Sequence, residues 1–131
     1  MTGAELVWIE EPVCLALHDR LLAIHGGASG VRDEGLLQSA LARAKQLAAY
    51  GDGADIIDMA AAYTAGIVKN HPFVDGNKRT GFVVGILFLE TNGFCFTASE
   101  SASADAVLAL AAGKLDEAGY SAFLRANVAP E

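Results

Sequence analysis

Ten consecutive residues near the middle of the chain, His71 to Thr80, combine side chains that together could transfer a phosphate-containing group. The run reads His-Pro-Phe-Val-Asp-Gly-Asn-Lys-Arg-Thr. Its imidazole can take up and release a proton near neutral pH, and its carboxylate is of the kind that holds Mg²⁺ beside phosphate oxygens. The glycine, the asparagine and the two cations offer groups that bind polyphosphates. A general base, a metal ligand and a phosphate clamp are therefore expected within one segment.

Each residue of this segment has an expected role. His71 is the candidate general base, and Asp75 is the candidate Mg²⁺ ligand. Gly76 lets the backbone approach a ligand closely. Lys78 and Arg79 fall in the first turn of a predicted helix, where the helix dipole disfavours cations. This conflict indicates an anion bound at the helix N-terminus.

Taken singly, these residues have ordinary structural explanations. A lone histidine in a loop is most often solvated or capping, an Asp-Gly pair is most often a turn, and a Lys-Arg pair is most often a solvated face. Phe73 is expected to anchor the loop in the core, and Pro72 to stiffen it. All of these explanations would have to hold together in the one segment that precedes an apolar helix. That coincidence favours the functional interpretation.

The charge of the chain narrows the kind of ligand. Nine basic residues against sixteen acidic ones give a formal net charge of −7. Nucleic acid and anionic membranes are therefore not expected as partners. Three of the nine basic residues, Lys69, Lys78 and Arg79, lie within eleven positions. A basic island of this size in an acidic chain predicts a small, highly charged anion as ligand.

The length of 131 residues, 53% of them apolar, predicts a single domain over residues 1–131. Alanine, leucine and glycine dominate, which favours an all-α fold. Cys14 and Cys95 are expected to be buried thiols in a reducing compartment, and His18 a satisfied, partly buried histidine. No signal-peptide pattern is present in residues 1–11, and the apolar run 81–89 is too short to span a bilayer. A soluble cytoplasmic protein is therefore expected.

Helix signals predict six helices around a buried central one. Capping residues, glycines and Pro72 place them at about 10–25, 33–50, 55–70, 77–91, 97–113 and 116–126, with a short extended piece at 94–96. The fourth is apolar on every side over 82–89 and is expected to be the central helix. Thr97 and Glu100 have the spacing of a capping box for the fifth. The first is expected to bury a stripe of Val13, Leu17, Leu21 and Ile24.

The run from His71 to Arg79 resembles the signature of the Fic/Doc superfamily, and specifically of Doc (death-on-curing) toxins. The nine-residue signature is highly specific, and the similarity covers most of residues 8–126. That family has a small all-α fold, in agreement with the predicted helices. Further segments similar to Doc are Leu17-His18-Asp19, Gly26-Gly27, the stretch 30–37, Ser39-Ala40-Leu41, Phe88-Leu89 and Asn92-Gly93.

The resemblance implies a role for each signature residue. His71 would take the proton from the target hydroxyl, Asp75 would hold Mg²⁺, and Phe73 would anchor the loop. The phosphates of ATP would be held by Gly76, Asn77, Lys78 and Arg79, with Lys69 as a further phosphate contact.

Lys78 bears on which group is transferred. Fic enzymes that transfer a nucleotide usually carry glycine at this position. In Doc the lysine goes with an inverted ATP, so that the γ-phosphoryl group passes to a threonine of elongation factor Tu and translation stops. The resemblance therefore implies a protein kinase that acts as a growth-arresting toxin. Two alternatives stay open, namely transfer of AMP to a protein hydroxyl and a catalytically idle binding module.

Inhibition is expected to come from a separate protein. Many Fic proteins carry an inhibitory helix with the motif Ser/Thr-x-x-x-Glu-Gly/Asn, but no serine or threonine of this sequence has glutamate four residues later. The family's usual alternative is a Phd-like antitoxin, whose disordered C-terminal part folds onto the toxin. The expected ligands are thus ATP and Mg²⁺, and the expected partners are a Phd-like antitoxin and elongation factor Tu.

Overall fold

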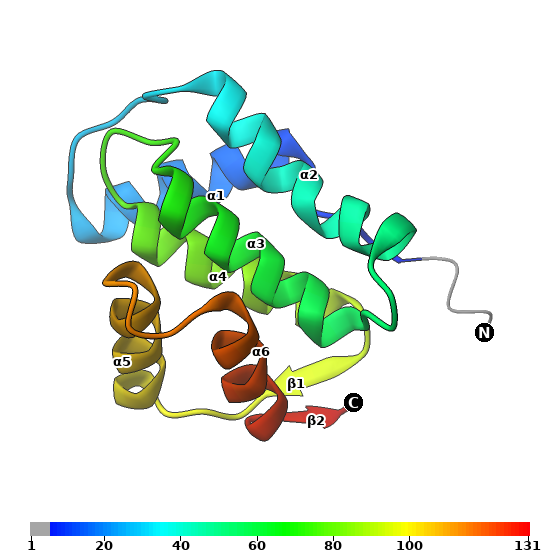
Figure 1. Ribbon diagram of the computed structural model, residues 1–131. Helices are drawn as coiled ribbons and strands as arrows, with labels where there is room; N and C mark the ends of the chain where they lie inside the picture. Colours follow the sequence, from blue (N-terminus) through cyan, green and yellow to red (C-terminus); the bar gives the residue numbers. More distant parts are fainter. Residues whose placement is uncertain (1–5) are drawn as a thin grey trace.

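Helix α3 (Ile56–Asn70) lies at the centre of the protein, and most other elements pack around it. The computed structural model describes residues 6–131, which form six helices and one two-stranded sheet (Figure 1). Every residue of α3 from 59 to 68 is buried. The predicted all-α fold is confirmed. The helices that contact α3 are α2 (Glu34–Tyr50), α4 (Asn77–Thr91), α5 (Glu100–Ala111) and α6 (Glu117–Ala126).

Small residues on α3 and its neighbours allow these helices to approach closely. A Cβ atom added at Gly66 would lie 3.2 Å from the backbone of Ala40 on α2. At Gly85 on α4, an added Cβ would lie 3.0 Å from the carbonyl oxygen of Ala60 and would overlap the hydroxyl of Thr64. That hydroxyl is fixed, because it donates a 2.7 Å hydrogen bond to the backbone of α4. Helices α2, α3 and α4 therefore pack with their backbones in near contact.

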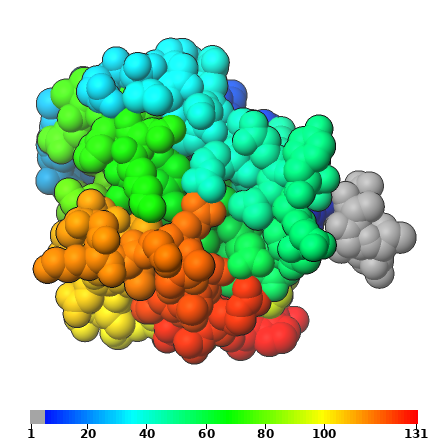
Figure 2. All heavy atoms as spheres, in the orientation of Figure 1, coloured from blue at the N-terminus to red at the C-terminus, as the bar shows by residue number. Residues whose placement is uncertain are grey.

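The two ends of the described chain close the bundle. Helix α1 (Glu11–His25) packs on α4, and strand β1 (Phe94–Phe96) pairs antiparallel with β2 (Val128–Pro130). The C-terminal segment returns to the middle of the chain through the contact of α6 with α3. Figure 2 shows its orange and red atoms lying directly against the green atoms of the middle segment.

Most predicted helix boundaries agree with the structure. Asp33, Asp55 and Asp116 are the N-caps of α2, α3 and α6, and each side chain accepts a backbone N–H. Helix α4 spans residues 77–91, and the extended piece at 94–96 is strand β1. Strand β2 has no sequence signal of its own, since it is three residues long and includes a proline.

The expectation that the fourth helix is the central one is wrong. Only one side of α4 is fully buried, whereas Phe82, Ile86 and Leu87 are half-buried. Phe82 packs edge-on against Phe96 of β1, with ring centroids 5.8 Å apart. A helix that is apolar all round can lie at the centre or form the wall of a pocket. Helix α3 occupies the centre because its alanines and glycine are small enough for other helices to pack on every side of it.

Three finer expectations are also corrected. The buried side of α1 carries Cys14 and His18, whereas Val13 and Ile24 of the expected stripe are exposed, because α1 packs only on its inner edge. Ser99, and not Thr97, caps α5, since the Thr97 hydroxyl donates to the carbonyl of residue 127. One of the two thiols expected to be buried, that of Cys95, is exposed, because alternate side chains of an edge strand face solvent.

The other thiol, that of Cys14, is fully buried. Burial, assisted by the nearby Glu11 carboxylate, raises the pKa of the Cys14 thiol to about 12. Cys14 is therefore an apolar core residue at neutral pH and not a nucleophile.

Within residues 6–131, none of the helices combines the length and the apolar character needed to cross a bilayer.

Asp55 is expected to stabilise the fold both as a helix cap and as an ionic partner. Its carboxylate accepts the N–H of Asp58 at 3.0 Å and pairs with Arg125 at 2.7 Å. Asp55→Ala should cost about 1–2 kcal/mol, because it removes the cap and the pair. Asp55→Asn keeps the cap and should cost less than about 1 kcal/mol, since the pair is half-exposed.

The contribution of this ion pair should depend on pH. The Arg125 guanidinium lowers the pKa of Asp55 to about 2 from the ordinary value of 3.8. The stabilisation by the Asp55–Arg125 pair is therefore fully present above about pH 4 and is lost as the pH falls toward 2. Urea unfolding of wild type and Asp55→Asn across this window should show the difference in free energy of unfolding shrinking. A difference that stays constant with pH would contradict the ionic contribution.

Candidate active site

The loop of residues 71–76 joins the C-terminus of α3 to the N-terminus of α4, and it begins with a strained residue. His71 has φ 51° and ψ 55°, and within residues 6–131 no other non-glycine residue has a positive φ. Its N–H donates to the carbonyl of Ile67 at 3.2 Å, which ends helix α3. The left-handed conformation turns the chain sharply, so that the imidazole projects from the end of the helix.

Asn77, the first residue of α4, holds the loop from inside. Its side chain is 7% exposed, its Oδ1 accepts the N–H of Phe73 at 3.0 Å, and its Nδ2 donates to the carbonyl of Phe73 at 3.0 Å. These two bonds set the orientation of the amide. An N–H group therefore faces Nδ1 of His71, at 3.4 Å. Assigned from this network, Nδ1 carries the lone pair, and the proton of the neutral ring is on Nε2.

Phe73 and His18 form the support beneath the loop. Phe73 is 1% exposed, and its ring stacks on that of His18 with centroids 3.8 Å apart and an angle of 9°. His18 is 2% exposed, and its Nε2 lies 2.8 Å from the carbonyl oxygen of Asp75, to which it donates. A residue of α1 thus holds the second half of the loop against the core.

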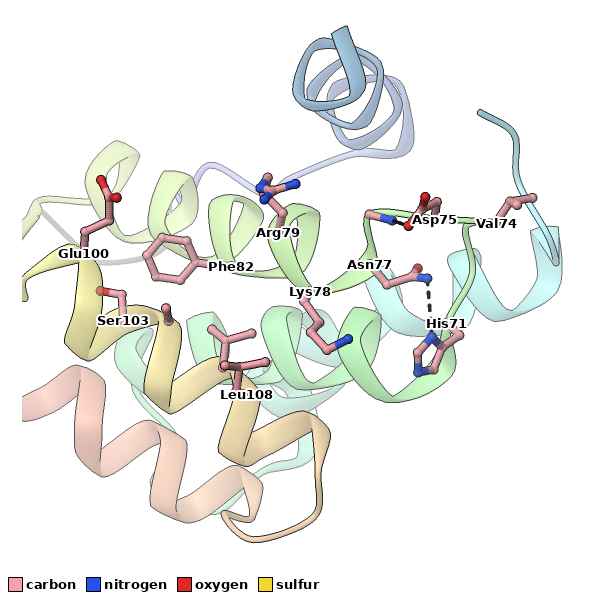
Figure 3. A pocket seen from close by; sticks show the side chains of 13 residues that line it. His71, Val74, Asp75, Asn77, Lys78, Arg79, Phe82, Glu100, Ser103 and Leu108 are labelled. Carbon is pink, nitrogen blue, oxygen red and sulfur yellow. Dashed lines mark hydrogen bonds between the residues drawn. The ribbon is translucent and has the colours of Figure 1, made fainter. Parts of the chain in front are cut away.

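A pocket of about 620 Å³ lies between this loop, α4 and α5. Its size is within the range of small-molecule sites. Figure 3 shows His71 and Asn77 at one end of the pocket and Phe82, Glu100 and Ser103 at the other. The lining residues are His71, Val74, Asp75, Gly76, Asn77, Lys78, Arg79, Phe82, Glu100, Ser103, Ala104, Val107 and Leu108.

The start of α4 supplies the anion-binding groups of the pocket. Helix α4 begins after Gly76, which has φ 79°, and no side chain caps its first N–H groups. Lys78 and Arg79 occupy its first turn, and Figure 3 shows the Lys78 ammonium turned toward His71. Uncapped N–H groups, the positive end of the helix dipole and two cations favour a polyphosphate here.

Asp75 offers a carboxylate in the pocket, just before the start of α4. Its oxygens accept the N–H groups of Gly76 at 2.9 Å and Ala28 at 3.2 Å, which orient the group. No cluster of three or more histidine, cysteine, aspartate or glutamate side chains within residues 6–131 forms a metal site. Mg²⁺ usually takes one or two carboxylates and completes its shell with phosphate oxygens and water. A single oriented carboxylate beside an uncapped, cationic helix start fits Mg²⁺ of the kind that is bound together with phosphates.

The structure brings together most residues expected at the site. His71, Asp75, Gly76, Asn77, Lys78 and Arg79 all line the pocket, and Phe73 lies buried beneath it. Lys69 is exposed on the last turn of α3 and does not line the pocket. Sequence reasoning missed the opposite wall on α5 and the support from His18. The wall carried no chemical signal, and the contact of His18 joins residues 57 positions apart.

Comparison with known proteins gives one family and two relatives. The sequence model of the Fic/DOC family matches residues 8–89, which is more than half of the chain. Over 79 residues the chain is 34% identical to "Protein kinase doc" of Escherichia phage P1, covering 60% of this chain and 63% of that protein. Over 70 residues it is 46% identical to "Toxin Doc" of Mycolicibacterium smegmatis, covering 52% and 53%. The matched part thus spans less than two-thirds of each relative, and the α5 wall lies outside the family match.

Proposed function

The chain belongs to the Doc group of the Fic/Doc family, and from this premise we propose that it is the toxin of a toxin–antitoxin pair and acts as a protein kinase. It would transfer the γ-phosphoryl group of ATP to a hydroxyl of a protein. The names of its relatives, a protein kinase and a toxin, support this assignment.

One observation carries the proposal. A histidine and an uncapped, doubly cationic helix start line the same pocket, with the Lys78 ammonium turned toward the imidazole (Figure 3). Phosphoryl transfer needs little covalent help from the protein and depends on positioning and charge stabilisation. The pocket offers both, since it has a proton acceptor at one end and phosphate-binding groups beside it.

The chain's own residues divide the reaction between them. His71 accepts the proton of the target hydroxyl on its unprotonated nitrogen, Nδ1 in this arrangement, and gives up only a 3.4 Å contact with Asn77. The hydroxyl oxygen then bonds to the γ-phosphorus as the bond to the β,γ-bridging oxygen breaks, and ADP leaves. Lys78, Arg79 and the first N–H groups of α4 stabilise the charge on the phosphate oxygens.

Asp75 is the residue that would hold Mg²⁺. When bound, the ion would neutralise charge on the phosphate oxygens. Asp75 keeps its direction through two backbone N–H donors, those of Gly76 and Ala28.

The proposed target and inhibitor are those implied by the resemblance to Doc. The proposed target is a threonine of elongation factor Tu, whose phosphorylation would stop translation. The proposed inhibitor is a Phd-like antitoxin that acts in trans.

The experiment that tests this function uses the purified chain, Mg²⁺, elongation factor Tu, and ATP labelled at either the γ- or the α-phosphorus. Label from γ alone is expected on the factor, and chelation of Mg²⁺ should abolish it. Label from α would replace the kinase with an AMP transferase. If neither label is transferred, yet the chain still arrests growth, the idle binding module is favoured.

Lys78→Gly tests whether this residue selects the transferred group. Loss of a charged hydrogen-bond donor should lower γ-transfer about 10- to 100-fold, since such bonds contribute about 1.5–3 kcal/mol. The ratio of γ- to α-label should also fall. The matched control is Lys114→Gly, which removes the same charge from an exposed turn outside the pocket. An unchanged ratio in Lys78→Gly would remove the argument that Lys78 determines the reaction.

A further inference from the structure

Arg32, outside the pocket, makes two side-chain contacts with the end of α3. Its Nε donates to the carbonyl oxygen of His71 at 2.7 Å, and its Nη2 donates to the carbonyl oxygen of Asn70 at 2.9 Å. Its backbone N–H donates to the carbonyl of Pro72 at 2.7 Å. One residue therefore holds three successive carbonyl groups around the candidate base, although it lies 39 positions away in the sequence.

These contacts fix the backbone on both sides of His71. Its N–H is bound to the carbonyl of Ile67, and its own carbonyl is bound by Arg32. With both flanking peptide groups held, the Cα–Cβ direction of His71 is set, and with it the place where the imidazole stands. The left-handed conformation at His71 is one that a side chain such as histidine adopts only when its surroundings impose it.

The guanidinium of Arg32 is committed to this task. No carboxylate within residues 6–131 lies at ion-pair distance from the Arg32 guanidinium. Three other cations do form ion pairs with acidic side chains, namely Lys45, Arg43 and Arg125. The carbonyls at a helix C-terminus are the negative end of its dipole, and a planar fork of N–H donors reaches two of them at once. A lysine ammonium has no such fork.

We infer that Arg32 is a positioning residue, which holds His71 in the left-handed conformation that aims its imidazole into the pocket. The expected effect of Arg32 on the rate rests on the proposed function. Its effect on the conformation of His71 does not depend on any activity. Arg32 does not line the pocket, so it acts through His71 and not on the nucleotide.

The kinetic test compares Arg32→Gln and Arg32→Lys with the control Arg43→Gln, which removes an arginine paired with Glu117 on α6. Arg32→Gln should lower kcat about 10- to 100-fold with KM for ATP changed less than about two-fold, because a misplaced base slows the step and leaves phosphate binding intact. The kcat of Arg32→Lys should lie between those of Arg32→Gln and wild type, since lysine keeps the charge and one donor. Arg43→Gln should match wild type.

The structural test is the NMR spectrum of His71. The ¹³Cα and ¹³Cβ shifts, which report its backbone conformation, should move in Arg32→Gln and stay in Arg43→Gln. A wild-type kcat in folded Arg32→Gln, or a raised KM with unchanged kcat, would overturn the inference. If wild type transfers no phosphoryl group, the proposed function fails and the NMR result alone decides. Unchanged His71 shifts in Arg32→Gln would then overturn the positioning role.

Discussion

Replacing His71 with alanine should lower the rate of phosphoryl transfer on the order of 100- to 10,000-fold, the range expected for loss of a general base. The fold should survive, because the imidazole is exposed and its one hydrogen bond within residues 6–131 is the 3.4 Å approach of Asn77. Histidine already pays the steric cost of the left-handed conformation, so replacing it with alanine should change the stability by less than about 1 kcal/mol. Transfer of γ-label to elongation factor Tu measures the rate, and urea unfolding checks the fold.

The matched control for this variant is His25→Ala, which removes an exposed histidine from the last turn of α1, outside the pocket. It should transfer at the wild-type rate. Full activity in folded His71→Ala would refute the assignment of the base. Growth arrest that persists in an inactive His71→Ala protein would point instead to a module that acts by binding its target.

Replacing Gly85 with alanine should destabilise the protein by about 1–3 kcal/mol, the usual cost of overpacking. The new Cβ would overlap the Thr64 hydroxyl and lie 3.0 Å from the carbonyl oxygen of Ala60. Neither neighbour can move freely, since both belong to the buried helix α3 and Thr64 is hydrogen-bonded to α4. Thermal or urea unfolding measures the loss.

Gly35→Ala makes the same chemical change where there is room. A Cβ at Gly35, in the first turn of α2, would meet only the Asp33 carboxylate, at 3.4 Å. Alanine is a better helix residue than glycine, so this variant should gain about 0.4–1 kcal/mol. Equal effects of the two substitutions would contradict the close packing of α3 and α4.

The candidate site was predictable to the extent that it is contiguous in the sequence. His71 to Arg79 lie on one loop and one helical turn, so their proximity follows from the chain itself. The α5 wall could not be predicted in this way. Its residues have no chemistry that singles them out, and only the packing of α5 against α3 and α4 brings Glu100 and Leu108 into one pocket with His71.

The helices were predictable where caps mark them, but their relative burial was not. Asp33, Asp55 and Asp116 are local signals, and each begins a helix as expected. Which helix lies at the centre depends on how many neighbours can reach it. The apolar run 82–89 made the fourth helix the expected centre. Helix α3 lies there instead, because its small side chains let four helices approach it.

His18 shows the same limit in a single residue. On the sequence it is an ordinary histidine in an apolar helix. The expectation is a satisfied, partly buried side chain, whereas the structure buries it almost completely, at 2% exposure. Its partner, the carbonyl oxygen of Asp75, has no sequence signature, because any residue would present the same backbone group.

The anchored loop between α3 and α4 has a consequence for how such a toxin would be controlled. Arg32, Asn77 and His18 hold the loop at its start, middle and end through hydrogen bonds to its backbone. An enzyme whose loop is held in this way would need no rearrangement of the loop after folding. Its output in a cell would follow the number of molecules left without an inhibitor. The decisive variable would then be the relative lifetimes of toxin and antitoxin, and a brief shortfall in antitoxin synthesis would be enough to release activity.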